Sequence, residues 1–274
     1  MSALLQGVAQ AAIFGDGNPE NGFEDQRLVP TENRPSAMAA VGTVICDGGL
    51  RGTATHIKSP SIDPSRSIIV TAAHILFDAK SGEKYASCSY LPENRRFSTA
   101  SFAAISAHNF DPLNDDKIAQ SENDIVFVAL NRPLQQPALL LSESRAIDNG
   151  NLSLLGYNSS QNQLTESAHC KQYASIQFAS EKLLLHDCDA RSGASGGPLL
   201  LRSDNDQPAK LIAVHGGTLL INGVGEAETH SASRDGAVAD PERWINQARR
   251  VDRAVLEQLQ RFVAYLAKDS QAQR

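Results

Sequence analysis

Three residues that could together perform nucleophilic chemistry lie at separate points of this 274-residue chain. Ser195 stands between glycines in the stretch GASGGP at 193–198, directly before the apolar run LLL at 199–201. Glycines permit a tight turn that leaves the serine hydroxyl accessible and lets the backbone N–H groups of Gly193 and Ser195 face a ligand. A serine attacks a carbonyl only when a base removes its proton and donors receive the oxyanion. The stretch predicts a nucleophile turn; the alternative is an ordinary Gly-Ser turn before a strand.

His74 and Asp124 are the candidates for the base and the acid that such a serine requires. His74 ends the run SIIVTAAH at 67–74, whose β-branched residues predict a strand and whose two alanines leave room around the imidazole. Asp124 begins the run DIVFVAL at 124–130, which predicts a second buried strand. A carboxylate at a strand end can orient an imidazole and stabilise its protonated form.

Other histidines and acids compete with these two candidates. The alternative for His74 is a core histidine whose ring is satisfied by a backbone carbonyl, but His56 and His108 fit that role better. Asp115 and Asp116 lie in a polar run without an adjoining strand, so we expect them to be solvated loop charges.

Three motifs, in the order His, Asp, Ser, resemble those of the chymotrypsin-like (trypsin-fold) serine endopeptidases: TAAH at 71–74, DIV at 124–126 and GASGGP at 193–198. The run DCD at 187–189, Ala194 and His215 together resemble the bacterial glutamyl-endopeptidase-like branch. The resemblance implies that Ser195 is the nucleophile, His74 the general base and later acid, and Asp124 the orienting carboxylate. It also implies an oxyanion hole made by the backbone N–H groups of Gly193 and Ser195. The expected reaction is hydrolysis of peptide bonds through an acyl-enzyme, without a metal ion or cofactor. Two alternatives are a catalytically silent protease-fold binding or adhesion protein, and a triad acyl hydrolase that acts on non-peptide esters.

The resemblance implies an all-β fold of two antiparallel six-stranded β-barrels with a C-terminal α-helix. Short β-rich runs separated by Gly, Pro, Asn and Asp clusters agree with such barrels. The strands predicted in the first half are 41–46, 52–57, 67–71, 102–107 and 125–130. Those predicted in the second half are 152–156, 173–178, 182–186, 197–201 and 211–215.

Four parts of the chain follow from these patterns. We expect an N-terminal extension or a signal or pro-segment remnant at 1–36, a first barrel with His and Asp at 37–140, a second barrel with Ser at 141–251, and a helix and tail at 252–274. Residues 218–243 read as an extended surface loop.

The helix is predicted by apolar residues at a spacing of 3.6. Val255, Leu259, Phe262 and Leu266 share one face, and Asp252 is placed to cap the first turn. We expect this face to pack against the protein's own barrel rather than against a partner.

The cysteine count is four, which is compatible with two disulfides and an oxidising compartment. None of the cysteines forms a Cys-x-x-Cys pair, which argues against a zinc site. Of the three possible connectivities we expect Cys170 with Cys188 and Cys46 with Cys88. The alternative is four buried thiols in a cytosolic protein.

Two residues give opposite indications about the substrate. Asp189 lies six residues before Ser195, where trypsin-like enzymes carry the acid that binds an Arg or Lys side chain. His215 and Gly216, in VHGG at 214–217, resemble the strand from which glutamyl endopeptidases offer a histidine to an acidic side chain. An Asp189–His215 pair would leave neither group free to select a charge. We expect the acidic preference, with Asp189 as a structural acid.

Composition limits the partners. The net charge is −6 and no basic stripe is present, so we expect a protein or peptide substrate and no nucleic acid. No stretch has the length and apolarity of a membrane span. Residues 1–12 are apolar and end in AQAA, which resembles the remnant of a signal sequence. The expectation is a secreted or periplasmic bacterial monomer.

Overall fold

The computed structural model describes residues 36–93, 98–143, 152–158, 163–173, 180–201, 209–222, 226–228 and 244–272. In these residues the strands form one connected sheet, joined by helices α1 (Lys117–Glu122) and α2 (Arg253–Ala272) and by the 3-10 turns η1 (Ser36–Ala40) and η2 (Ala73–Leu76). None of the described helices has the length and apolarity needed to cross a membrane. Because the described strands form the connected sheet and the helices lie outside it, the fold is all-β, as the sequence predicts.

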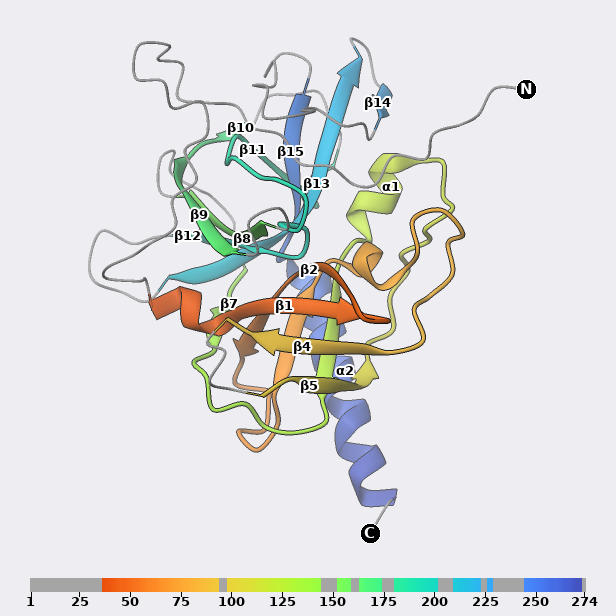
Figure 1. The fold of residues 1–274 in the computed structure, drawn as a ribbon, viewed down its shortest axis with the longest axis vertical. Helices are drawn as coiled ribbons and strands as arrows, with labels where there is room; N and C mark the ends of the chain where they lie inside the picture. Colours follow the sequence, from red (N-terminus) through yellow and green to blue (C-terminus); the bar gives the residue numbers. More distant parts are fainter. Residues whose placement is uncertain are drawn as a thin grey trace.

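The N-terminal half forms a closed six-stranded antiparallel barrel (Figure 1). Its strands are β1 (Val41–Cys46), β2 (Gly49–Lys58), β3 (Ile68–Thr71), β4 (Cys88–Pro92), β5 (Ala100–Ile105) and β6 (Val126–Leu130). They pair in the order β1-β4-β5-β6-β3-β2, and a further pairing of β2 with β1 closes the ring. Closure leaves no free strand edge.

The C-terminal half contains the remaining strands, and all of them except β7 lie in the upper part of Figure 1. They are β7 (Leu139–Leu141), β8 (Leu152–Asn158), β9 (Gln163–Cys170), β10 (Gln172–Tyr173), β11 (Leu183–His186), β12 (Pro198–Leu201), β13 (Lys210–Asn222), β14 (Glu226–Glu228) and β15 (Trp244–Arg250). One ladder runs β9-β8-β12-β13, and another runs from β13 through β15 and β11 to β10. Strand β7 joins the halves, because it pairs in parallel with both β2 and β13.

Most predicted strands are confirmed, and β1 has the predicted bounds. Strand β5 begins and ends two residues earlier than expected. Of the strand predicted at 173–178, only its first residue lies among the described residues. The predicted surface loop at 218–243 is wrong at its start, because β13 continues to Asn222 and pairs there with β14; residues 229–243 lie outside the described part.

Both predicted disulfides are confirmed. Cys46 and Cys88 are register partners on β1 and β4, so their bond cross-links neighbouring strands of the barrel. Cys170 at the end of β9 is bonded to Cys188, seven residues before Ser195. The segment that leads to the serine is thereby attached to the sheet of its own half.

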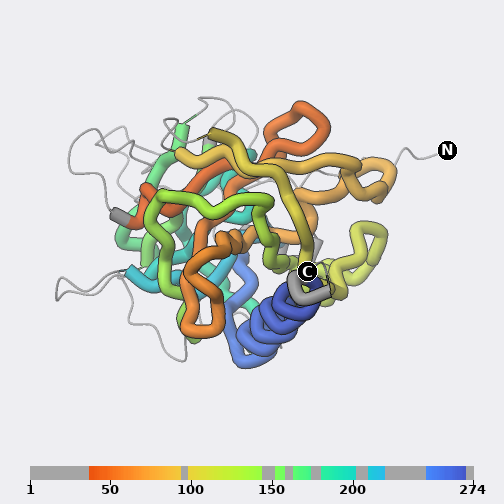
Figure 2. Tube along the Cα trace, turned by 90° about the horizontal axis from the view of Figure 1, so that it is seen from below, coloured from red at the N-terminus to blue at the C-terminus, as the bar shows by residue number. Residues whose placement is uncertain are grey.

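Helix α2 packs as its periodicity predicts. The Asp252 carboxylate accepts a hydrogen bond from the backbone N–H of Val255 at 2.9 Å, which is the predicted N-cap. The four apolar residues of its inner face are buried and belong to the hydrophobic cluster that contains the core of the N-terminal barrel. Figures 1 and 2 show α2 lying alongside this barrel, with its C-terminal end projecting beyond it.

Substitutions in α2 test this packing. Leu259 is 1% exposed and Tyr265, on the same helix, is 58% exposed. We expect Leu259→Ala to lower the free energy of unfolding by about 2–5 kcal/mol, because it leaves a cavity in the barrel core. Tyr265→Ala is the control, and we expect it to change stability by less than ~0.5 kcal/mol. Equal effects in urea titrations would contradict this placement of α2.

Candidate active site

His74 and Asp124 meet at one end of the N-terminal barrel. Strands β3 and β6 are antiparallel neighbours with Thr71 opposite Val126, so the residues after β3 and before β6 lie at the same edge. His74 follows β3 in η2, and Asp124 precedes β6 after the short helix α1. The barrel therefore brings together two residues that are 50 positions apart.

Both carboxylate oxygens of Asp124 bind His74. Oδ2 lies 2.7 Å from the ring Nδ1, and Oδ1 accepts the backbone N–H of His74 at 2.8 Å. The Asp124 side chain is 4% exposed and that of His74 is 21% exposed. Since a carboxylate accepts hydrogen bonds, Nδ1 carries the proton in this pair and Nε2 keeps its lone pair. This arrangement has the imidazole tautomer that a general base requires.

Ser195 lies in a pair of tight turns. A hydrogen bond from the Ala194 N–H to the Arg191 carbonyl, 2.9 Å, closes the first turn, and one from the Gly197 N–H to the Ala194 carbonyl, 2.8 Å, closes the second. Gly193 has φ of 100° and Gly196 has φ of 84°, a backbone region that glycine adopts without steric cost. The prediction of a glycine-dependent turn is confirmed.

Thr53 of β2 attaches this turn to the N-terminal barrel. Its N–H donates to the Ser195 carbonyl at 2.7 Å, and its hydroxyl donates to the Gly193 carbonyl at 2.6 Å. The same hydroxyl accepts the N–H of Tyr157 from β8 at 2.9 Å. Thr53 is fully buried. This role could not be predicted from the sequence, because nothing about a threonine within a predicted strand indicates which distant residue it contacts.

Gly196 lies against the end of β3. A Cβ atom built on Gly196 would stand 2.1 Å from the Thr53 carbonyl oxygen, 2.2 Å from Thr71 Oγ1 and 3.2 Å from the Ala72 nitrogen. Only a glycine permits this approach. The residue after Ser195 is thus in contact with the chain two positions before His74.

His215, which the sequence suggests as a substrate-binding residue, is fully buried. Its N–H donates to the Gly197 carbonyl at 2.9 Å, and its carbonyl accepts the Gly196 N–H at 2.7 Å, so β13 supports the serine turn. The next residue, Gly216, lies beside Asp124: a Cβ built on it would stand 3.1 Å from Asp124 Oδ2.

The His215 ring pairs with a second buried histidine, His186 of β11. His215 Nδ1 lies 3.3 Å from His186 Nε2, and His186 Nδ1 accepts the N–H of Cys188 at 3.2 Å. Because His186 Nδ1 accepts a hydrogen bond, the proton of His186 is assigned to its Nε2, which donates to His215 Nδ1. The proton of His215 is therefore assigned to its own Nε2. His215 Nε2 is buried and has no hydrogen-bond partner among the described residues, although the Gln247 carbonyl is near enough to raise its pKa slightly.

Asp189 is buried at 3% exposure, and its N–H donates to Ser167 Oγ at 2.9 Å. The ring of His215 is paired with His186, a partner that the sequence reasoning did not foresee. The only indication of His186 in the sequence is its position at the end of the apolar run LLLH at 183–186.

The competing residues take structural roles. His56 Nδ1 lies 3.1 Å from the Pro137 carbonyl, which confirms the predicted core histidine. His108 lies edge-on to Phe77, and its Nδ1 has no partner among the described residues. Asp115 and Asp116 are exposed, as predicted for solvated charges, and Asp116 also caps α1 by accepting hydrogen bonds from two N–H groups of its first turn. Within the described ranges, no cluster of three His, Cys, Asp or Glu side chains could hold a metal ion.

Comparisons with known proteins agree with this site. The trypsin-like peptidase domain matches residues 52–206, more than half of the chain, and these include the His74, Asp124 and Ser195 positions. The chain belongs to the trypsin-like peptidase family. That membership supports a hydrolase of the serine peptidase kind. A search of curated protein sequences gave no match.

Solved structures show the same fold at low sequence identity. A Glu endopeptidase in complex with MPD is 16% identical, covers 92% of this chain and 100% of its own, and has a TM-score of 0.60. The protease Anisep from Arthrobacter nicotinovorans is 13% identical over 84% of this chain and 97% of its own, with a TM-score of 0.57. The thermostable serine protease AL20 from an extremophilic microorganism is 15% identical over 84% and 99%, with a TM-score of 0.58.

The buried histidine pair predicts a loss of stability in acid. Burial lowers the pKa of His215 from 6.5 to about 3, and burial together with the neighbouring His215 lowers the pKa of His186 well below its usual value. In the unfolded chain histidine takes up a proton near pH 6.5, so the unfolded state binds more protons below that pH. The free energy of unfolding therefore falls between pH 6.5 and 3, by as much as ~1.4 kcal/mol per pH unit from His215 alone.

Denaturant titrations at pH 7, 6 and 5 measure this slope. We expect His215→Gln to make the slope shallower than in the wild-type protein, whatever its own stability at pH 7. Equal slopes in the two proteins would contradict this prediction, because they would mean that folding does not lower the pKa of His215.

Proposed function

We propose that the protein is a serine endopeptidase that cleaves peptide bonds through an acyl-enzyme. The observation that carries the proposal is the His74–Asp124 pair, bonded through both carboxylate oxygens and set beside the glycine turn of Ser195. His74 Nε2 takes the proton of the Ser195 hydroxyl as the oxygen attacks the carbonyl carbon, and returns it to the leaving amine. A water molecule then repeats the sequence and releases the acid product.

The backbone N–H groups of Gly193 and Ser195 are the proposed oxyanion hole. Supporting this, the Ala194 carbonyl, which shares a peptide plane with the Ser195 N–H, accepts the Gly197 N–H at 2.8 Å. Thr53 holds the two neighbouring peptides through the Gly193 and Ser195 carbonyls. Donors that are fixed before reaction contribute about 10²- to 10³-fold to turnover each.

Labelling with a fluorophosphonate probe tests the nucleophile. We expect stoichiometric labelling of the wild-type protein, none of Ser195→Ala, and little of His74→Ala, because the serine oxygen needs its base. Circular dichroism of the Ser195→Ala variant should match the wild type. A folded wild-type protein that takes no label would favour a silent binding protein, and cleavage of small esters without cleavage of casein would favour a non-peptide acyl hydrolase.

We further propose that the enzyme prefers an acidic residue before the scissile bond. Supporting this, the buried Nε2–H of His215 has no hydrogen-bond partner among the described residues. An unpaired buried donor costs about 1–3 kcal/mol, which a substrate carboxylate can recover. Gly216 and Gly217 follow on β13 and add no side chain beside it. Asp189, which is buried and follows the disulfide-bonded Cys188, takes a structural role in this proposal.

Cleavage of a peptide library tests the preference. We expect cleavage after Glu or Asp, and a loss of about 10- to 100-fold in kcat/KM for such peptides in His215→Gln, the loss of a hydrogen bond to a charged group. Asp189→Asn is the control, and we expect it to keep the acidic preference. Cleavage only after Arg or Lys, lost in Asp189→Asn, would overturn the assignment.

We also infer that the C-terminal half closes into a second six-stranded barrel. Strand β10 follows β9 after a single residue, Lys171, and β10 pairs with β11, so one bent strand links the two ends of the ladder. The parts of the chain are then the extension 1–36, barrels at 37–140 and 141–251, and the helix and tail 252–274. Two disulfides are compatible with secretion or a periplasmic location, and a protein or peptide substrate is the proposed partner.

A further inference from the structure

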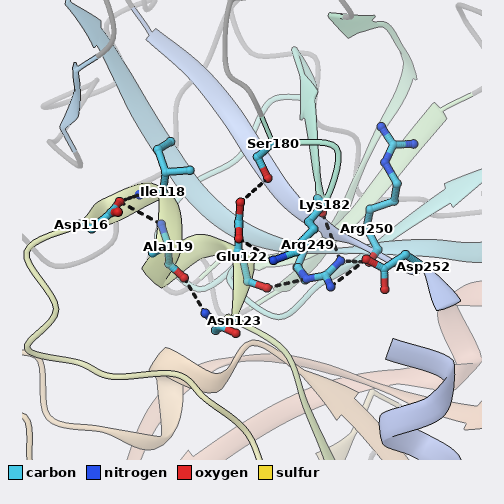
Figure 3. A network of polar contacts seen from close by, with 10 residues as sticks. All are labelled: Asp116, Ile118, Ala119, Glu122, Asn123, Ser180, Lys182, Arg249, Arg250 and Asp252. Atoms are coloured by element: carbon cyan, nitrogen blue, oxygen red, sulfur yellow. Dashed lines mark hydrogen bonds and ion pairs between the residues drawn. The ribbon is translucent and has the colours of Figure 1, made fainter. Parts of the chain in front are cut away.

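Arg249 is a buried arginine of β15 that contacts the segment leading to the proposed catalytic acid (Figure 3). Its side chain is 5% exposed. Nε donates to the carbonyl of Glu122, the last residue of α1, at 2.6 Å, and one terminal nitrogen donates to the Lys182 carbonyl at 3.2 Å. The other lies 2.9 Å from Asp252 Oδ2. Each of the three guanidinium nitrogens thus has an acceptor, and the three acceptors come from separate parts of the chain.

The Glu122 side chain also has its partners in the C-terminal half. Ser180 Oγ donates to its Oε1 at 2.6 Å, and Lys182 Nζ lies 2.7 Å from its Oε2. Both the backbone and the side chain of Glu122 are therefore bound by residues of the C-terminal half. A cation at the carboxyl end of a helix is also favoured by the orientation of the peptide dipoles.

A short, hydrogen-bonded segment connects Glu122 to Asp124. The Asp124 N–H donates to the Ser121 carbonyl at 3.2 Å, and the Ile125 N–H donates to the Asn123 carbonyl at 2.9 Å. The Asn123 side chain donates to the Ala119 carbonyl at 2.8 Å. These bonds leave little freedom between the carbonyl that Arg249 binds and the carboxylate that binds His74.

Asp252 extends the contact to α2. One of its oxygens pairs with Arg249 while the other caps the helix through the Val255 N–H. Helix α2 packs in the core of the N-terminal barrel, and α1 leads into β6 of the same barrel. The guanidinium of Arg249 therefore comes from the half that carries Ser195 and fixes two elements of the half that carries His74 and Asp124.

We propose that Arg249 is a positioning residue, which holds the end of α1 so that Asp124 reaches both the ring and the backbone N–H of His74. The inference rests on the proposed triad. Alignment of such groups has to hold within about 0.5 Å, and a displacement of about 1 Å can cost 100-fold in rate. The two bonds of Asp124, at 2.7 and 2.8 Å, depend on where its backbone is placed.

The test compares Arg249→Met with Arg250→Met. Arg250 is the next residue, carries the same charge and is half-buried, but its guanidinium has one long contact, 3.5 Å, with the Leu183 carbonyl, and Figure 3 shows its side chain pointing away from Glu122. We expect Arg249→Met to lower kcat about 10- to 100-fold with KM nearly unchanged, and Arg250→Met to keep kcat within about twofold of the wild type.

A second readout separates positioning from stability. In the wild type the His74 Nδ1 proton, bonded to Asp124, should give a low-field NMR resonance in ¹⁵N-histidine-labelled protein. We expect this resonance to move upfield and broaden in Arg249→Met, and to stay in place in Arg250→Met. If Arg249→Met fails to fold, Lys182→Met loosens the Glu122 side chain from a more exposed position, and we expect a smaller change of kcat and of the resonance in the same direction.

The outcomes distinguish this inference from the proposed function. A folded Arg249→Met protein of reduced stability, with wild-type kcat and an unshifted His74 resonance, would overturn the positioning role. A wild-type protein that takes no fluorophosphonate would overturn the function instead, and the resonance would still report whether Arg249 sets the His74–Asp124 geometry.

Discussion

Thr53 makes the hydrogen bonds on which the whole site depends, because the serine turn and the His74–Asp124 pair belong to different halves of the chain. Its N–H and hydroxyl bind the carbonyls on both sides of the nucleophile, and the hydroxyl also accepts from β8. Thr53 is fully buried, where such bonds are electrostatically stronger and where a lost partner is costly. One residue of the first barrel thereby sets the position of the Ser195 turn relative to His74.

Other contacts, within and between the halves, act around this point. Gly196 allows the turn to touch β3, the two hydrogen bonds of His215 hold the turn from β13, and Arg249 holds the segment before the acid. The His74–Asp124 pair and the Ser195 turn are thus positioned by backbone contacts and buried polar groups. Such support from neighbouring groups is what a preorganised site requires.

The sequence predicted what depends on local pattern. Apolar β-branched runs located β1, β3 and β6, and the spacing of 3.6 located α2 with its Asp252 cap. It missed β9 and β15, because their buried residues include Glu166, Gln247 and Arg249, and polar residues in a buried strand leave no apolar alternation to read. The same reason hid the partners of His215 and of the α1 end. These contacts join strands far apart in the chain, and one sequence holds no record of such pairs.

The packing of α2 has a consequence for how the protein is made. Val255, Leu259, Phe262 and Leu266 complete the core of a barrel whose strands lie at 41–130. During synthesis the six strands of the N-terminal barrel are therefore available for pairing while the face that α2 covers is still exposed, because the helix follows them in the chain. The barrel that holds His74 and Asp124 gains this cover only after the segment with Ser195 has been translated. The full stability of the first barrel therefore depends on a helix that is made after the second half of the protein.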